Sequence, residues 1–358
     1  MSISKLCESL SKKNGVTIKL LTTNANGSED LPVTVGKEVI VDGVSVTYFK
    51  RITGDPHESS PQLWKYLFSH AKDYDIVHIH AWWNLVAVLS ALLCIIKGSK
   101  IIVSPRGMLS QYILQTNNSR QKRFLHSLLG KYLLSKSYYH ATSDQEYHEC
   151  KHLIKGWQGF TIPNIVELPL IAISKPLNEV FTIGFLSRID PKKGIEFVFE
   201  AIRQSSFPVH FKIAGKGDEA YIAELKQLAA TLQIADKIEW LGWKGPEDKF
   251  HELMSFDLFV LSSYNENFAN VVIEALYMGT PVCISEHVGL AHFVEKHNLG
   301  WVTALTTTSV QKAISDAYFD TDKRRRIEKE GRQVILSEFS EDVVVQHYID
   351  MYKAVLHN

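Results

Sequence analysis

The 358-residue sequence has little that would mark a secreted, metal-binding or membrane-spanning protein. Its four cysteines, Cys7, Cys94, Cys150 and Cys283, form no CxxC pair, so neither a disulfide framework nor a zinc knuckle is indicated and a reducing compartment fits. The N-terminus has no apolar signal segment. The longest apolar run, residues 85–96, is much shorter than the roughly 20 residues of a membrane-spanning helix. These absences favour a cytoplasmic protein.

Net charge is also absent, because 39 Lys and Arg residues balance 39 Asp and Glu residues. This balance argues against binding of nucleic acid through bulk positive charge. The charge is nevertheless divided along the chain. Residues 1–165 carry 19 basic and 12 acidic side chains, a net charge of +7, and the remainder carries −7. The length favours two domains of roughly 150 to 180 residues each.

Short β-branched runs alternate twice with longer helical patterns, which predicts two α/β domains with parallel sheets. In the first half, strands are expected at residues 16–21, 75–80, 100–104 and 138–142, with a hairpin formed by 38–40 and 44–49. In the second half, strands are expected at residues 181–186, 209–214, 238–241, 258–261 and 282–285. Residues 165–180 contain two prolines and no clear period, so they are expected to link domains 1–165 and 166–340.

The start of the first domain is unusual. A Rossmann-like domain opens with a strand, then a glycine-rich turn, then a helix. This chain opens on a helical pattern in which Ile3, Leu6, Cys7 and Leu10 share one face, and it proceeds directly to the strand at 16–21. We therefore expect the first strand and its loop to be missing from this domain. A terminal helix packed outside the sheet is the alternative.

The densest polar cluster follows the strand at 258–261. Glu266 lies in the loop and Glu274 within the first turns of a helix expected to be capped near Asn270. The residues that lead into this helix are Asn267, Phe268, Ala269 and Asn270. A helix N-terminus offers unpaired N–H groups and partial positive charge to a diphosphate, while two carboxylates can accept hydrogen bonds from vicinal sugar hydroxyls. The alternative is a solvated loop glutamate and an ordinary acidic residue near the helix start.

Arg188 and Lys193 form a second cluster after the strand at 181–186. They lie at the carboxyl end of a parallel strand, where open α/β sheets bind ligands. A forked guanidinium and an ammonium together could neutralise a pyrophosphate leaving group. A solvated basic turn is the alternative.

In this order the two clusters resemble the nucleotide-binding domain of family 4 GT-B glycosyltransferases. Glu266 and Glu274 match that family's E-x7-E motif, and Arg188 and Lys193 match its phosphate-binding arginine and lysine. The resemblance implies that Glu274 holds the ribose of the nucleotide and Glu266 a hydroxyl of the donor sugar. Residues 267–270 replace the commoner G-F-G and are expected to contact phosphate and sugar through their backbone.

The first half carries a weaker likeness to family members that build capsule or lipopolysaccharide, at residues 75–83 and 104–109. Many members have a functional histidine where this chain has Arg106, so Arg106 becomes a candidate for contact with acceptor or phosphate. His80 shares one strand face with His78. Two histidines without a third ligand make a poor metal site, so we expect a core or cleft-wall role on the acceptor side.

The resemblance implies an α/β protein of the GT-B fold, with two Rossmann-like domains facing across a cleft. The acceptor would bind the first domain and the nucleotide sugar the second, and a final helix in 341–358 would return to the first. The implied reaction moves a hexosyl unit from a UDP-, GDP- or other nucleotide diphosphate sugar to a surface-polysaccharide or lipid-linked acceptor, with retention of configuration and without metal or cofactor. A GT-B nucleotide-sugar epimerase and a catalytically impaired donor-binding or scaffold protein are the alternatives.

Residues 101–143 contain no acidic side chain, and residues 119–136 read as a basic amphipathic helix. Such helices dock on anionic lipid, so we expect peripheral association with the inner face of the cytoplasmic membrane. The alternative is a solvated basic face over an ordinary core-packing stripe.

Overall fold

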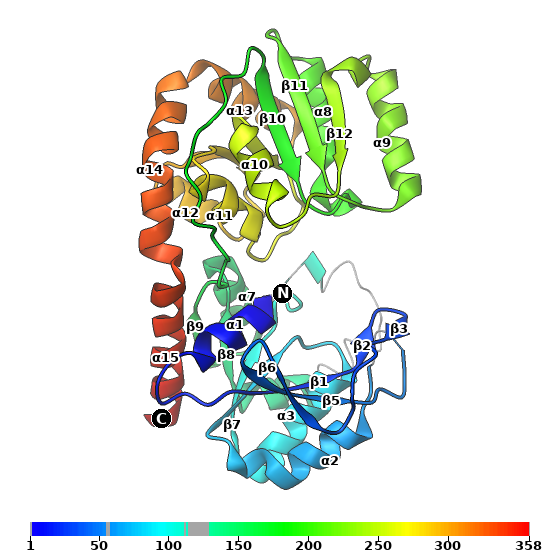
Figure 1. Cartoon of the computed structure of the whole chain (residues 1–358), viewed down its shortest axis with the longest axis vertical. Coiled ribbons are helices and arrows are strands. Elements are labelled where there is room, and N and C mark those ends of the chain that lie inside the picture. The colour runs from blue at the N-terminus through cyan, green and yellow to red at the C-terminus, as the bar shows by residue number, and fades with distance from the viewer. Residues whose placement is uncertain (1, 55–57, 111, 114–128, 358) are drawn as a thin grey trace. The chain divides into compact units, whose positions relative to one another are not determined.

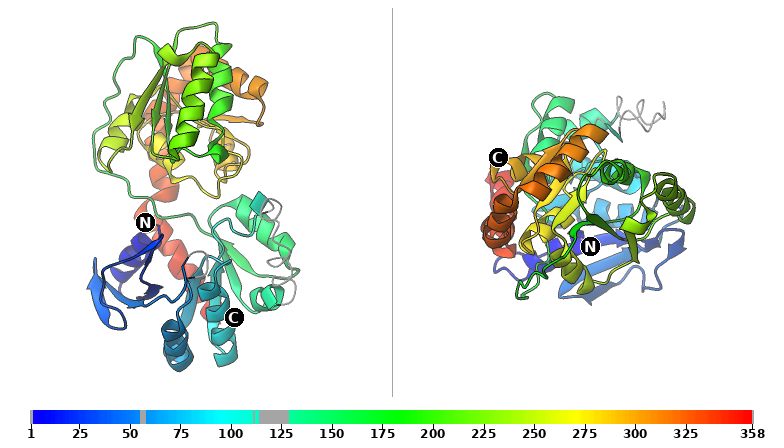
Figure 2. Two further views of the ribbon diagram at one scale, coloured as in Figure 1. Left: turned by 90° about the vertical axis from the view of Figure 1, so that its right-hand side faces the viewer. Right: turned by 90° about the horizontal axis from the view of Figure 1, so that it is seen from above.

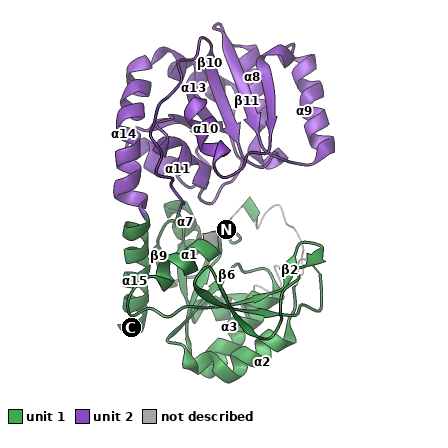
Figure 3. Cartoon of the chain, viewed as in Figure 1, with its two compact units in different colours: residues 1–165, 341–358 green, residues 166–340 purple. Residues whose placement is uncertain are grey.

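A computed structural model describes residues 2–54, 58–110, 112–113 and 129–357. The chain forms two compact units, each of α/β architecture. Unit 1 consists of Met1–Ile165 together with Glu341–Asn358, and unit 2 of Val166–Ser340 (Figure 3). Both units are built on parallel strands, so the predicted fold class is confirmed (Figure 1).

Unit 2 is built on one six-stranded parallel sheet with the order β12-β11-β10-β13-β14-β15. Its strands are β10 (Phe181–Leu186), β11 (Val209–Ala214), β12 (Ile238–Gly242), β13 (Leu258–Leu261), β14 (Val282–Ser285) and β15 (Gly300–Thr303). Helices flank both faces of this sheet (Figure 2). They are α8 (Ile195–Arg203), α9 (Glu219–Thr231), α10 (Asp248–Ser255), α11 (Asn270–Tyr277), α12 (Ala291–Lys296), α13 (Thr307–Phe319) and α14 (Thr321–Phe339).

The sheet of unit 2 is buried on both faces because helices cover it. All four residues of β13 are buried, as are all four of β14. Such strands read as continuous apolar runs rather than alternating ones, and this made them recognisable in the sequence. The strand order reverses between β10 and β13, so the loops that follow these two neighbours diverge. A crevice at the carboxyl ends of such strands is the usual ligand site of an open α/β sheet.

Unit 1 contains two principal sheets. The first has the order β4-β5-β1, formed by β1 (Lys19–Thr23), β4 (Glu38–Val41) and β5 (Val44–Phe49). The second has the order β6-β7-β8-β9, formed by β6 (Ile76–His80), β7 (Lys100–Ser104), β8 (Tyr138–Ala141) and β9 (Gly159–Thr161). A small antiparallel pair, β2 (Ala25–Asn26) and β3 (Glu29–Asp30), completes the strands described in this unit.

The helices of unit 1 form two groups. One contains α2 (Pro61–His70) and α3 (Leu85–Lys97), which pack against each other; the other contains α1 (Ser2–Ser11) and α15 (Glu341–His357), which also touch. The short α6 (Lys131–Ser135) and α7 (Asp144–Leu153) precede and follow β8. Leu6 and Leu10 of α1 are 3% and 1% exposed in a cluster shared with α15. The N-terminal helix is therefore part of the core of this unit.

Three details differ from the expectations. The strand expected at 16–21 begins three residues later, at Lys19. In the expected hairpin, Val41 belongs to strand β4, so only Asp42 and Gly43 form the turn between β4 and β5. Strands β2, β3, β9 and β15 were missed. The missed strands are short and lie at sheet edges, where burial imposes a weaker apolar pattern.

The expected basic helix at 119–136 falls mainly outside the described residues. Of that segment, 129–136 is described, and α6 within it buries Leu133 and Leu134 while Tyr132 is exposed. Among the residues that the structure describes, no helix is long and apolar enough to cross a membrane.

Candidate functional site

The loops after β10 and β13 in unit 2 bring together the polar side chains singled out in the sequence. The loop after β10 contains a short 3-10 helix, Pro191–Lys193, which Asp190 caps by accepting a hydrogen bond from the backbone N–H of Lys192 at 3.0 Å. Gly194 follows with φ 61°, and a Cβ there would collide with the carbonyl oxygen of Ser262. Glycine is therefore required, because the two loops touch backbone to backbone.

Two further contacts fasten these loops together. The hydroxyl of Ser262 donates to the carbonyl oxygen of Gly194 at 2.6 Å. The backbone N–H of Tyr264 donates to the carbonyl oxygen of Lys192 at 2.9 Å. Functional groups carried by the two loops are thus held at a fixed separation.

The ammonium of Lys193 donates directly to Oε1 of Glu266, which also accepts a hydrogen bond from the Ser263 hydroxyl at 3.3 Å. Lys193 is only 8% exposed. The backbone of Glu266 is held in place as well. Its N–H donates to the carbonyl oxygen of His287 at 3.0 Å, and its carbonyl oxygen accepts from the backbone N–H of Gly289 at 2.8 Å. The site therefore presents a positioned cation and a positioned carboxylate whose charges offset each other.

Helix α11 starts beside this pair. Its N-cap position is Ala269, with φ 62° and ψ 72°, rather than the expected Asn270. Left-handed backbone is unfavourable for a residue with a Cβ, by about 1–2 kcal/mol. Phe268, 3% exposed, anchors the loop against Phe339 with ring centroids 6.0 Å apart. Asn267 and Asn270 are half-buried on either side of this turn.

Glu274 lies on α11 and is 7% exposed. Its Oε1 accepts a hydrogen bond from the ammonium of Lys249, on α10, at 2.7 Å. Lys249 was not selected from the sequence, since it lies 25 residues from Glu274 on a different helix.

Arg188 is exposed at the end of β10, and no described residue forms a hydrogen bond or ion pair with its guanidinium. The loop after β11 supports this turn. A Cβ at Gly215 or Gly217 would collide with the carbonyl oxygen of Ser187 or Ile189, so both glycines allow close approach of the two loops.

In unit 1, His80 is the last residue of β6 and Arg106 follows the neighbouring strand β7, and the two side chains are in contact. Nη2 of Arg106 lies 3.3 Å from Nδ1 of His80, and Nη1 donates to Oδ1 of Asn164. Because a guanidinium can only donate, Nδ1 of His80 accepts the hydrogen bond from Arg106. The proton of the neutral His80 ring is therefore on Nε2. Arg106 has φ 56°, a strained conformation for a non-glycine residue.

Glu146, which is 2% exposed, holds the Arg106 turn in place. Its Oε1 accepts from the backbone N–H of Gly107 at 2.6 Å, and its Oε2 accepts from that of Thr142 at 2.7 Å. The sequence pattern did not identify this residue, because Glu146 lies near the start of a polar helix like many solvated acids.

The half-buried His78 and the buried His140 form a hydrogen-bond chain through Ser104. Nδ1 of His78 lies 3.0 Å from the Tyr352 hydroxyl, and its Nε2 lies 3.3 Å from Oγ of Ser104. Ser104 is also bonded to Nδ1 of His140, whose Nε2 donates to the carbonyl of Ile162 at 2.8 Å. Neutral rings satisfy this chain, with one ring nitrogen of each histidine as donor and the other as acceptor.

Burial lowers the pKa of these histidines. It lowers the pKa of His140 to about 3, with a further contribution from the charge of Arg106. The pKa values of His78 and His80 are also well below the usual range, again mainly because of burial. Their rings stack with centroids 4.3 Å apart. The described residues contain no group of three or more His, Cys, Asp or Glu side chains arranged to hold a metal ion.

Comparison with known proteins yields two family matches that together span most of the chain. Residues 2–168 match the family described as Glycosyltransferase Family 4, and residues 171–334 match Glycosyl transferases group 1.

Among curated proteins, the lipopolysaccharide core biosynthesis glycosyltransferase LpsE of Rhizobium meliloti is 25% identical over 167 residues, 46% of this chain and 48% of its own length. The putative colanic acid biosynthesis glycosyltransferase WcaL of Escherichia coli is 25% identical over 198 residues, 52% of this chain and 47% of its own. The chain thus spans about half the length of the curated relatives it matches.

Two solved structures share the fold. Sucrose-phosphate synthase from Thermosynechococcus elongatus superposes with a TM-score of 0.75 at 18% identity, covering 99% of this chain and 92% of that one. HepE from Anabaena, solved in complex with UDP and glucose, gives a TM-score of 0.69 at 19% identity and covers 87% of both chains. At these identities the likeness establishes the arrangement of the backbone.

Proposed function

Because the chain belongs to the family 4 glycosyltransferases with the GT-B fold, we propose that it is an enzyme that transfers a hexosyl unit from a nucleotide diphosphate sugar. The acceptor in this proposal is a growing surface polysaccharide or a lipid-linked saccharide. One observation carries the proposal: the loops after β10 and β13 hold Lys193 against Glu266 beside the N-terminus of α11. A cation, a carboxylate and the backbone N–H groups of a helix N-terminus are the groups that a sugar diphosphate requires.

In the proposed donor complex, Glu274 accepts hydrogen bonds from the ribose hydroxyls and Glu266 from a hydroxyl of the sugar. Lys193 has three N–H groups, so it can contact a phosphate oxygen while it keeps its bond to Glu266. Arg188, exposed and without a described partner, contributes a second cation, and the backbone of residues 267–270 contacts phosphate and sugar. HepE, which has this fold, is described in complex with UDP-glucose, which supports a donor of this class.

The proposed reaction breaks the bond between the anomeric carbon and the diphosphate oxygen, and the electron pair leaves with the diphosphate. The acceptor hydroxyl forms the new bond from the same face, so configuration is retained, and its proton passes to a diphosphate oxygen. Arg188, Lys193 and the partial positive charge of the α11 N-terminus stabilise the departing charge. The proposal thereby assigns charge neutralisation to side chains rather than to a metal ion or cofactor.

On the acceptor side, we place the saccharide near Arg106 and His80 of unit 1. Asn164 and His80 hold the guanidinium in a fixed orientation, which suits recognition of hydroxyl or phosphate oxygens. For a lipid-linked acceptor, the basic residues of 119–136 supply attraction to an anionic membrane surface.

One observation favours the alternative of a donor-binding protein without turnover. The described strands of unit 1 form two separate principal sheets, β4-β5-β1 and β6-β7-β8-β9, rather than one. A protein whose acceptor unit has a divided sheet would bind nucleotide sugar through unit 2 and fail to transfer it.

Thermal unfolding with a panel of UDP and GDP sugars tests the proposal. A ligand at about 100 times its Kd stabilises the folded state by about 2.7 kcal/mol, so one donor should raise Tm measurably. Glu274→Ala should abolish the shift. Glu252→Ala is the matched control, because Glu252 forms a comparable 2.7 Å ion pair with Lys244 in the same unit.

The outcomes separate the candidates. A donor shift in the wild type with saccharide product formed only when acceptor is present supports transfer. A donor shift without product under any acceptor condition supports the binding protein, and a changed sugar without acceptor indicates an epimerase. If no nucleotide sugar shifts Tm, the proposal is wrong.

A further inference from the structure

The hydrogen-bond chain through Ser104 crosses the β6-β7-β8-β9 sheet on the face that α15 covers. His78 belongs to β6, Ser104 to β7 and His140 to β8, and the chain ends at the carbonyl oxygen of Ile162, directly after β9. On the same face, Ile102 and Ile162 pack with apolar residues of α15. A polar group enclosed in such surroundings needs a hydrogen-bond partner, so each link of the chain matters.

The positions of the protons in this chain follow from its carbonyl end. A carbonyl oxygen only accepts, so Nε2 of His140 carries a proton and donates it to Ile162. Burial, together with the charge of Arg106, lowers the pKa of His140 to about 3, so the ring is neutral. Its Nδ1 therefore accepts from the hydroxyl of Ser104. That hydroxyl has one hydrogen, so it accepts in turn from Nε2 of His78.

The same reasoning fixes the proton at the α15 end. Burial holds the pKa of His78 well below its usual range, and the neighbouring positive charges, including Arg106, act in the same direction. The neutral ring has its one proton on Nε2, so Nδ1 accepts. The hydroxyl of Tyr352 on α15 lies 3.0 Å from Nδ1 and is therefore the donor. All hydrogen bonds of the chain thus point from α15 toward β9.

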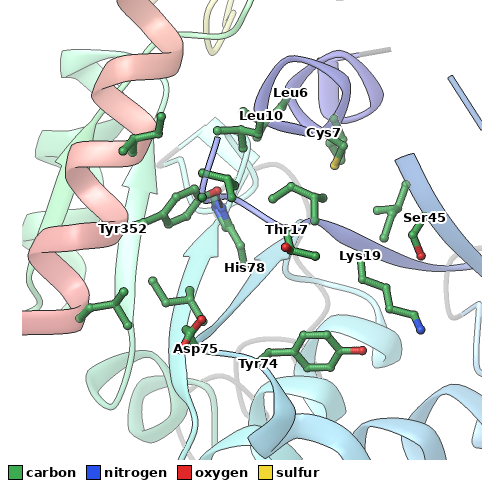
Figure 4. A pocket seen from close by; sticks show the side chains of 18 of the residues that line it. Leu6, Cys7, Leu10, Thr17, Lys19, Ser45, Tyr74, Asp75, His78 and Tyr352 are labelled. Atoms are coloured by element: carbon green, nitrogen blue, oxygen red, sulfur yellow. Dashed lines mark hydrogen bonds between the residues drawn. The ribbon is translucent and has the colours of Figure 1, made fainter. Parts of the chain in front are cut away.

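Tyr352 orients the His78 ring beside open space. A cavity of about 530 Å³ is lined by both residues and by Leu6 and Leu10 of α1. Figure 4 shows the Tyr352 side chain extending from α15 toward His78 at this cavity. No other described group forms a hydrogen bond with Nδ1 of His78. Because packing does not enclose the ring on this side, its orientation depends on its hydrogen bonds.

His80 lies against His78 on the side of the proposed acceptor site. The two rings stack with centroids 4.3 Å apart and an angle of 28° between their planes. Since Nδ1 of His80 accepts from Arg106, the proton of its neutral ring is on Nε2. His80 is partly exposed, and no described residue accepts a hydrogen bond from this N–H. It is therefore available to an oxygen atom of a ligand.

We propose that Tyr352 is a positioning residue of the acceptor site. Its hydroxyl fixes the His78 ring, and the His78 ring fixes the stacked His80 ring, whose Nε2–H donates to a hydroxyl oxygen of the acceptor saccharide. This inference rests on the proposed acceptor role of His80. Tyr352 acts through the two histidines and does not touch the acceptor itself.

NMR of isotope-labelled protein reads the histidine tautomers directly. Long-range proton–nitrogen correlations at neutral pH should show His78, His80 and His140 with the proton on Nε2 and none on Nδ1. Single His→Gln variants at these positions assign the signals. A proton on Nδ1 of His78 would overturn the proposal, because Tyr352 would then accept and the direction of the chain would be reversed.

Tyr352→Phe keeps the aromatic ring and removes the hydroxyl. Without its donor, Nδ1 of His78 should no longer be held as the acceptor, so His78 should show both tautomers and the ring signals of His80 should shift. KM for the acceptor saccharide should rise about three- to tenfold, as expected for loss of one hydrogen bond. The kcat at saturating acceptor and the thermal shift caused by the donor should stay at wild-type values, because only acceptor binding is weakened.

Tyr348→Phe is the matched control, one turn earlier on α15. The Tyr348 hydroxyl lies 3.3 Å from Nε2 of His140, whose proton is already donated to Ile162 at 2.8 Å. Its removal should leave the direction of the chain, the His78 and His80 signals and the acceptor KM unchanged. Equal effects of the two substitutions would indicate a general disturbance of α15 and would contradict the proposal.

The remaining outcomes separate this inference from the proposed function. If Tyr352→Phe leaves the signals of His78 or His80 unchanged, Tyr352 does not position these rings and the inference is wrong. If the signals shift while the acceptor KM does not, the hydroxyl has only a structural role, which also overturns it. A wild-type protein that forms no saccharide product contradicts the proposed function, whereas the NMR comparison still shows whether Tyr352 positions the two rings.

Discussion

Lys193 and Glu266, which lie 73 residues apart, form a direct ion pair between the loops after β10 and β13. Neither partner is fully solvated, since their side chains are 10% and 19% exposed. An ion pair in this setting partly offsets the cost of desolvating each charge. It also keeps the ammonium oriented before any ligand arrives, which lowers the reorganisation required when a phosphate binds.

We expect Lys193→Ala to lower kcat by about 100-fold or more, because removal of one positioned donor for developing negative charge typically has that effect. Steady-state kinetics with the donor identified by thermal shift provides the measurement. Lys192→Ala is the control, since Lys192 precedes it in the same turn and contributes its backbone carbonyl to Tyr264. Equal losses in the two variants would contradict a specific role for Lys193.

Ala269→Gly should stabilise the protein. Ala269 holds a left-handed backbone conformation, with φ 62°, that glycine adopts without steric cost. The gain expected is about 0.5–1 kcal/mol, or about 1–4 °C in Tm for a domain of this size. Calorimetry checks it.

The contrasting variant is Ala229→Gly. Ala229 is 2% exposed inside α9, where glycine costs about 1 kcal/mol relative to alanine. The two substitutions should shift Tm in opposite directions. A decrease for Ala269→Gly comparable to that for Ala229→Gly would mean that the turn tolerates alanine without strain.

The buried histidines predict loss of stability in acid. Because burial lowers the pKa of His140 to about 3, the unfolded chain binds its proton near pH 6.5 while the folded chain does not. Stability therefore falls as pH decreases below about 6.5, by up to about 1.4 kcal/mol per pH unit for each such histidine. His78 and His80 act in the same direction.

Urea unfolding at pH 7.5, 6.5 and 5.5 measures this slope. His140→Gln should be less stable at neutral pH and have a shallower pH dependence, because it removes one proton-binding site from the unfolded state. His152→Gln, at an exposed position on α7, should leave the slope unchanged. If His140→Gln and the wild type have the same slope, His140 does not contribute to the acid sensitivity.

Local patterns predicted most strands of this fold. The strands from β10 to β14 agree with their expected bounds to within one residue, because continuous apolar runs mark strands that are buried on both faces. The error at β1 has a physical cause. Its residues are only partly buried, so the apolar pattern from Val16 onward does not mark where pairing with β5 begins.

Prediction of the candidate site was less complete. Arg188, Lys193, Glu266 and Glu274 could be selected because strand ends and helix starts are readable from sequence. Lys249 could not be selected, since its contact with Glu274 depends on how α10 packs beside α11. Glu146 was missed for the same reason, because its hydrogen bonds to Gly107 and Thr142 join residues brought together by neighbouring strands.

By itself the sequence determined the fold class and the family, because both reside in local periodicity and in residue types at fixed spacings. Only the tertiary structure decided which charges meet, such as Lys193 with Glu266 and Arg106 with His80. It also decided that a tyrosine of α15 meets a histidine of β6 that lies 274 residues earlier in the sequence. Those properties depend on strand order and side-chain direction, which arise only when distant segments of the chain pack together.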